Sequence, residues 1–151
     1  MAADRGVPEP STGRAGRVAR GVARVLAAAG LAVNAYIHAR LADSYDAVAA
    51  DISQGTLFRV EAGLASLAAL LVLIWRRPMA DLFAWLVAAG GLALLLIYRY
   101  VDVGTLGPVP NMYEPVWTTD KRLTVVSQAV TVLATVFLLL APARRSDRRR
   151  R

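Results

Sequence analysis

Four long apolar runs alternate with short polar segments along the chain, at about residues 22–41, 57–75, 79–101 and 123–141. A helix of about 20 apolar residues, at about 1.5 Å per residue, crosses the hydrocarbon core of a bilayer. The pattern therefore predicts four transmembrane helices. Because successive helices with short connections pack as antiparallel neighbours, we expect an all-α, integral membrane four-helix bundle with up-down-up-down topology.

The segments outside these runs have a different composition. Residues 1–17 are rich in proline, glycine, serine and arginine, which predicts a disordered basic arm. Residues 144–151 form a basic tail, and residues 18–143 hold the transmembrane domain. The arm and the first run together also fit a signal peptide. The length of that run, with Asn34 and His38 in its later half, favours a retained membrane helix instead.

Arginine is distributed unevenly between the two ends of such a bundle. The arm, Arg76, Arg77 and the tail all fall on one side, and the positive-inside rule makes that side cytoplasmic. Both termini are then cytoplasmic, and the loops at residues 42–56 and 102–122 are extracytoplasmic. We therefore expect a multi-pass protein of the plasma (cell) membrane.

Composition agrees with this interpretation and narrows the chemistry. The chain is 56% hydrophobic with a mean hydropathy of +0.44. Its net charge of +7 comes largely from arginines that flank apolar runs, so we expect no nucleic-acid partner. The lack of cysteine excludes disulfides and thiolate metal sites, and the single histidine excludes multi-histidine sites within one chain. No catalytic or metal-binding motif stands out, so we assign no catalytic residue, metal ligand or cofactor.

The segment at residues 98–120, YRYVDVGTLGPVPNMYEPVWTTD, is neither apolar helix nor basic tail. Its turn signals follow one another closely: Gly104, Gly107, Pro108 and Pro110. It is longer than a plain helix connector needs, and its apolar residues and prolines predict an ordered segment. We expect it to fold back over the outer end of the bundle as a cap, with Asn111 and Glu114 above the helices. A short helix at residues 111–117 is compatible with the sequence, although Pro115 limits it.

Several ionisable residues come to similar depth near the outer end under this topology. Charges within a membrane usually face the bundle interior, pair, or reach the interface. Arg59 and Glu61 are two residues apart and point to different sides of their helix, which favours a Glu61–Arg99 ion pair. The alternatives are arginines that reach the headgroups and a histidine that is simply hydrogen-bonded. The candidate residues for binding a ligand or partner are His38, Arg59, Glu61, Arg99, Asp102, Asn111, Tyr113, Glu114 and Trp117.

Two segments of this chain resemble a known group of sequences. ISQGTLFR at 52–59 and YRYVDVGTLGPVPNMYEPVW at 98–117, with the following Lys121, are similar to small four-span actinobacterial membrane proteins whose function is uncharacterised. The resemblance covers roughly residues 31–140. The layout is also similar to that of DoxX-like proteins, and this likeness implies a role as a membrane redox accessory.

Several functions are compatible with these features. We favour a non-enzymatic module whose outer face binds a partner, a lipid or a small ligand. The alternatives are a redox accessory with a quinone or haem near His38, and a small proton-coupled transporter that uses Glu61 and Arg99. The sequence is also compatible with an enzyme that acts on lipid or cell-wall precursors, since Glu61 and Glu114 could supply an acid or base. The expected partners are the lipid bilayer, another membrane or extracytoplasmic protein, and a second copy of the chain.

Overall fold

The computed structural model describes residues 12–141, in which four long helices are joined by loops and one short 3₁₀ helix. The elements are α1 (Thr12–Leu41), η1 (Ala42–Tyr45), α2 (Gln54–Ile74), α3 (Pro78–Tyr100) and α4 (Thr119–Leu140). Each long helix is long and apolar enough to cross a membrane. The prediction of an all-helical bundle with four candidate membrane spans is confirmed.

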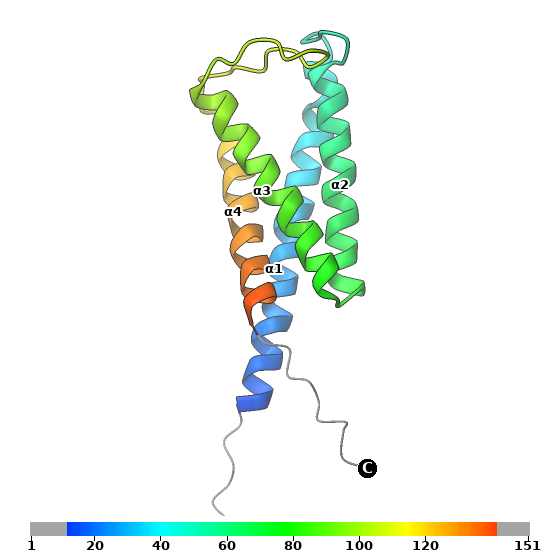
Figure 1. Cartoon of the computed structure of the whole chain (residues 1–151), viewed down its shortest axis with the longest axis vertical. Coiled ribbons are helices and arrows are strands. Elements are labelled where there is room, and N and C mark those ends of the chain that lie inside the picture. The colour runs from blue at the N-terminus through cyan, green and yellow to red at the C-terminus, as the bar shows by residue number, and fades with distance from the viewer. Residues whose placement is uncertain (1–11, 142–151) are drawn as a thin grey trace, which may run out of the picture.

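Successive helices run in opposite directions (Figure 1). The loops at residues 42–53 and 101–118 lie at one end of the bundle, which we call the loop end. The turn at residues 75–77 lies toward the opposite end, the terminal end, where α1 begins and α4 ends. α1 and α3 lie diagonally across the bundle and each packs on α2 and α4. α3 crosses obliquely, so that α2 and α3 are close at the turn and diverge toward the loop end.

The helix boundaries differ from the predicted ones at two places. α1 begins at Thr12 instead of residue 22, so residues 12–17 are helical and not part of a disordered arm. Arg14, Ala15 and Arg17 favour a helix here, and the helix continues through this stretch despite Gly13 and Gly16. α4 begins at Thr119 instead of residue 123, because the Thr118 side chain caps it by accepting a hydrogen bond from the Lys121 N–H. Residues 1–11 and the basic tail lie outside the described residues.

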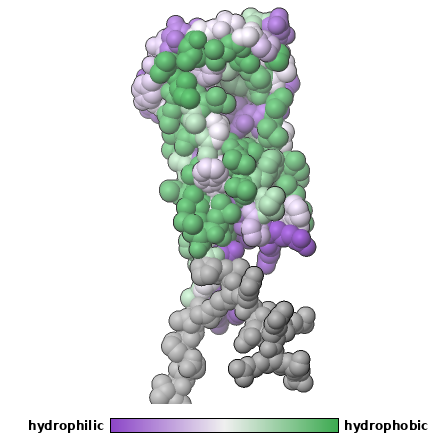
Figure 2. Space-filling view, viewed as in Figure 1, coloured by the Kyte–Doolittle hydropathy of each residue, from purple (hydrophilic) through white to green (hydrophobic). Residues whose placement is uncertain are grey.

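Small side chains fill the core of the bundle. Five fully buried alanines lie at helix contacts: Ala27, Ala65, Ala68, Ala84 and Ala88. Gly30 brings α1 so close to α4 that an added Cβ would lie 2.3 Å from Thr131 Oγ1. Many of the large aliphatic side chains instead point outward and make the sides of the bundle apolar (Figure 2). Close contacts between small residues, with large apolar ones outside, are typical of helices that associate within a membrane.

A buried ion pair fastens the bundle near its terminal end. Arg24 of α1 donates two hydrogen bonds to the Asp81 carboxylate of α3, at 2.8 and 3.1 Å. It also donates to the Val72 carbonyl of α2, at 2.9 Å. Both charged side chains are buried. Because this bidentate arrangement satisfies each charge and ties three helices together, its role is structural.

The segment at residues 101–118 is ordered and crosses the loop end (Figure 1). It turns at Gly104 and Gly107, which both have positive φ, and its Pro108 carbonyl accepts a hydrogen bond from the Ile52 N–H. The short helix that the sequence allows at residues 111–117 does not form. The Glu114 N–H donates to the carbonyl of Tyr98 instead, and Pro115 has no N–H to give.

Candidate functional site

A cavity of about 510 Å³ lies below this segment, in the half of the bundle nearer the loop end. All four long helices contribute to its lining, and the segment at residues 101–118 closes it from above. Its walls are mainly apolar and include Ile37, Leu57, Phe58, Leu95, Val109 and Met112. A volume of roughly 300–1,000 Å³ with mostly apolar walls is typical of small-molecule binding sites.

The cavity opens at the side of the bundle, where α2 and α3 diverge. Val60 of α2 and Leu94 of α3 both line it, yet their side chains are 53% and 56% exposed. In Figure 2 a small hydrophilic area interrupts the apolar surface in the upper half of this face. A molecule with an apolar chain could therefore enter from the side of the bundle that would face lipid.

A buried polar network forms the deep end of the cavity. Asn34 of α1 donates from Nδ2 to Glu61 Oε1 of α2, at 2.8 Å. Gln128 of α4 donates from Nε2 to Asn34 Oδ1, at 3.2 Å. Gly91 of α3 packs against this network, since an added Cβ would lie 2.4 Å from Gln128 Nε2. Glu61 lines the cavity, and its carboxylate is held by Asn34, which is held in turn by Gln128.

The predicted ion pair between Glu61 and Arg99 is wrong. The hydrogen-bond partner of Glu61 is Asn34, and no acidic side chain of residues 12–141 forms an ion pair with Arg99. Eight residues separate Arg99 from Gly91, which corresponds to about 12 Å along a helix axis. The carboxylate and the guanidinium therefore line the same cavity at two different depths.

Arg99 is held by aromatic rings. Its guanidinium carbon lies 5.0 Å from the centre of the Tyr100 ring and 5.1 Å from the centre of the Trp117 ring. Such contacts between a cation and a ring face are attractive and restrict the side chain. Arg99 Nε is buried and has no hydrogen-bond partner among the described residues. The side chain thus presents a positioned but unpaired charge at the loop end of the cavity.

The remaining charges at the loop end of the cavity are paired. Lys121 forms an ion pair with Glu114 at 2.9 Å, and Tyr45 Oη donates to the same carboxylate at 3.3 Å. Asp120 pairs with Arg40 of α1. The contacts of Glu114 fasten the segment at residues 101–118 to α4 and to η1, and the Arg40–Asp120 pair joins α1 to α4. Glu114 is thus both part of the cavity wall and part of the closure above it.

His38 lines the cavity one turn along α1 from Asn34. Its Nδ1 lies 2.9 Å from the Asn34 carbonyl oxygen, and its ring packs edge-on against Phe58 at 5.0 Å between centroids. A carbonyl oxygen can only accept, so Nδ1 carries a proton and Nε2 keeps its lone pair in the neutral ring. His38 is therefore hydrogen-bonded, which is one of the alternatives that the sequence left open. Its Nε2 remains available to a ligand.

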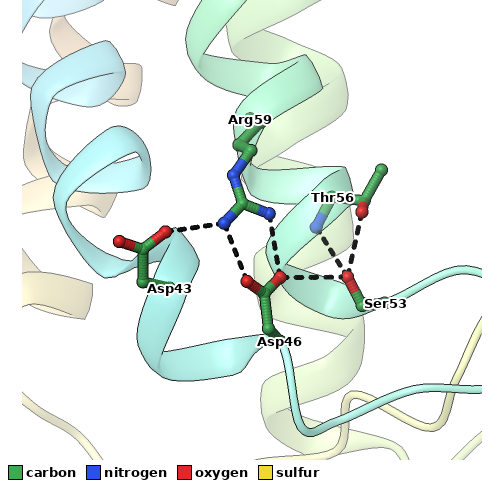
Figure 3. Close-up of polar contacts among 5 residues, drawn as sticks. All are labelled: Asp43, Asp46, Ser53, Thr56 and Arg59. Carbon is green, nitrogen blue, oxygen red and sulfur yellow. Dashed lines mark hydrogen bonds and ion pairs between the residues drawn. The ribbon is translucent and has the colours of Figure 1, made fainter.

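Arg59 is not part of the cavity lining. It donates to both carboxylate oxygens of Asp46 at 2.8 Å and to Asp43 at 2.6 Å (Figure 3). Asp46 also accepts a hydrogen bond from Ser53, the residue that caps α2. The Arg59 hydrogen bond lowers the pKa of the Asp46 carboxyl below its ordinary value. This cluster fastens the loop at residues 42–53 onto the start of α2.

The other predicted site residues lie in or beside the loop above the cavity. Asp102 accepts a hydrogen bond from Asn111 Nδ2 at 2.7 Å, which holds the two ends of a turn together. Asn111 and Tyr113 are exposed and do not line the cavity. Trp117 supports Arg99 and packs edge-on against Tyr100. Of the nine predicted residues, the structure places four in the cavity lining: His38, Glu61, Arg99 and Glu114.

Sequence reasoning missed Asn34 as the partner of Glu61, and Gln128 as the partner of Asn34. Each is an amide within an apolar run, and a buried amide in a membrane helix needs a partner from another helix. The two amides within apolar runs were therefore the signal in the sequence for a buried polar network. The sequence does not show which faces of the helices meet, so it could not identify the partner.

Comparisons with protein-family models, with curated proteins and with solved structures find no match to this chain. The resemblance to small four-span actinobacterial proteins and to DoxX-like proteins therefore stays a prediction.

Proposed function

We propose that this protein is a multi-pass membrane protein that binds an amphiphilic molecule in the cavity that opens between α2 and α3. The observation that carries the proposal is the combination of apolar walls with two polar groups, Glu61 and Arg99, at two depths of one cavity. An amphiphile can bury its apolar part against the walls while its polar groups meet these side chains. The opening beside Val60 and Leu94 provides a route from the bilayer.

We propose that the loop end is extracytoplasmic and that the protein lies in the plasma membrane. Arg14, Arg17, Arg76 and Arg77 are exposed near the terminal end, and the positive-inside rule favours a cytoplasmic position for such residues. In this orientation, the cavity takes its ligand from the outer leaflet.

Binding is favoured over catalysis because most charged groups at the site already have partners. Glu114 and Asp120 are held in ion pairs, and the Glu61 carboxylate is held by Asn34. These contacts position the groups and close the loop above the cavity. A ligand-binding module accounts for this arrangement without a proton-transfer step.

Filling the cavity tests the proposal. Leu95→Trp would place a large side chain in the lining, whereas Leu133→Trp is a matched control on the outer surface of α4, where Leu133 is 71% exposed. The proteins are purified in mild detergent, checked for helix content, and analysed by native mass spectrometry and organic extraction. We expect an amphiphile on the wild type and on Leu133→Trp, and its loss from Leu95→Trp. A wild type without any bound amphiphile would overturn the proposal.

A quinone is the second candidate ligand, because His38 lines the cavity and keeps one ring nitrogen for a ligand. A quinone is itself an amphiphile, so it would use the same apolar walls. Optical spectra of the purified protein before and after reduction test this candidate. Absorbance changes of a quinone would support it, and extraction of a lipid without a redox-active ring would exclude it.

A further inference from the structure

Among the described residues, the cations that line the cavity are Arg99 and Lys121. Lys121 is paired with the Glu114 carboxylate and also donates to the Glu114 carbonyl at 2.6 Å. Arg99 donates no hydrogen bond to any of residues 12–141. A guanidinium has five N–H donors, and the Nε–H of Arg99 is buried without a hydrogen-bond partner among the described residues, which is costly.

We propose that Arg99 binds the phosphate group of the amphiphile, so that the cavity selects phosphate-bearing lipids. This inference rests on the proposed function, because it identifies the polar group of the same ligand. The planar guanidinium matches phosphate oxygens through paired hydrogen bonds, which a compact ammonium group cannot reproduce. The rings of Tyr100 and Trp117 hold it in position before the ligand arrives, which reduces the entropy lost on binding.

The position of Arg99 along its helix supports a lipid phosphate. It is the next-to-last residue of α3, at the level where the segment at residues 101–118 begins. The end of a transmembrane helix lies near the headgroup region, where lipid phosphates are found. The apolar chain would extend past Leu94 and Leu95 toward the opening between α2 and α3, above Gly91 and the Glu61 carboxylate, which lie at a level about 12 Å deeper along the helix.

The charges facing Arg99 permit an anion there. The carboxylates of Glu114 and Asp120 are neutralised by Lys121 and Arg40. Glu61 is the carboxylate of the lining that has no cationic partner among residues 12–141, and it lies at the deep end. The loop end of the cavity therefore keeps one positive charge that a phosphate can neutralise.

Arg99→Gln tests the inference, with Arg122→Gln as a matched control. Arg122 is an exposed arginine in α4 at the same end of the bundle, and it does not line the cavity. Arg99→Lys keeps the charge but loses the paired geometry, so it also reports whether a folded, charged variant binds. The probes are a short-chain phosphatidic acid, the matching diacylglycerol, the matching fatty acid and inorganic phosphate. Binding is measured by native mass spectrometry and by the fluorescence of Trp117, in a background in which Trp75 and Trp85 are replaced by Phe.

We expect the wild type and Arg122→Gln to prefer the phosphatidic acid to the diacylglycerol by at least about tenfold, because a hydrogen bond to a charged group is worth about a decade in affinity or more. Arg99→Gln should lose this preference and still bind the diacylglycerol, and Arg99→Lys should keep only part of it. An unchanged preference in Arg99→Gln would overturn the inference. So would equal binding of fatty acid, or of inorganic phosphate alone. If the wild type binds none of the amphiphiles, the proposed function itself fails.

Discussion

Asn34 and Glu61 join α1 to α2 through a hydrogen bond of 2.8 Å at the deep end of the cavity. The donor is an amide that is 1% exposed, and the acceptor is a carboxylate that lines the cavity. A buried amide inside a membrane bundle requires a partner, and Glu61 supplies it. This bond therefore serves the stability of the bundle and fixes the carboxylate that a ligand would meet.

Replacing Glu61 separates these two roles. Glu61→Gln keeps an oxygen that can accept from Asn34, so its thermal stability in detergent should stay close to that of the wild type. Glu61→Leu leaves the Asn34 amide without its acceptor and should cost about 1–3 kcal/mol. If Glu61→Gln is as unstable as Glu61→Leu, the negative charge itself stabilises the bundle and the hydrogen-bond account is wrong.

Two adjacent glycines of α3 provide a matched pair of variants. An alanine Cβ at Gly91 would lie 2.4 Å from Gln128 Nε2 and 2.9 Å from Glu61 Oε1, whereas Gly90 has no other side chain or chain segment within 4 Å. We expect Gly91→Ala to destabilise the protein by about 1–3 kcal/mol, because the added methyl group would displace the Gln128 and Glu61 side chains from their hydrogen bonds with Asn34. Gly90→Ala should cause no loss. Thermal unfolding in detergent measures both, and equal stabilities would contradict the packing described here.

The buried ion pair between Arg24 and Asp81 should matter more than the exposed one between Arg40 and Asp120. Asp81→Ala would leave a buried arginine without its partner and should cost about 3–5 kcal/mol. Arg40→Ala, at an exposed pair, should cost about 0–1 kcal/mol. The double variant Arg24→Met/Asp81→Leu should recover most of the loss in a thermal unfolding experiment. No recovery would mean that the pair does more than hold α1 and α3 together.

Acid should release the loop at residues 42–53 from α2 only at low pH. The Arg59 hydrogen bond lowers the pKa of Asp46 below its ordinary value of 3.8 in the folded protein. A carboxyl with a lower pKa in the folded state contributes stability above the unfolded pKa, and this contribution is lost as the pH falls through the folded pKa. An NMR titration of the Asp46 carboxyl carbon should therefore give a midpoint below 3.8. Arg59→Gln should move the midpoint upward, and an unmoved midpoint would contradict the role of Arg59.

The sequence predicted the parts of the fold that depend on local patterns. The four apolar runs gave the four helices, and the turn residues Gly104 and Gly107 marked the segment that crosses the loop end. The Glu61–Arg99 pair was wrong for a different reason. Hydropathy gives the depth of a residue but not the rotation of its helix, and the rotation of α1 turns Asn34 toward Glu61. The start of α1 was misplaced because residues 12–17 are polar and contain Gly13 and Gly16, so neither hydropathy nor helix propensity marks the extension of the helix through them.

Arg24 illustrates the same limit at the terminal end. In the sequence it is one of many arginines near the first apolar run, and the positive-inside rule explains such residues without any partner. The structure shows that it is buried against Asp81, from a helix more than fifty residues away along the chain. Only the packing of α1 against α2 and α3 distinguishes it from Arg14 and Arg17, which are exposed on the same helix.

Photo-crosslinking in membranes tests the central claim most directly. A lipid analogue with a photoreactive group in its acyl chain is added to membranes that contain the protein, and the labelled peptides are identified after irradiation. Ligand in the cavity predicts labels on residues 57–61 of α2 and 91–95 of α3, lost in Leu95→Trp. Labels spread evenly over the outward-facing residues of all four helices, and unchanged in that variant, would contradict a binding cavity.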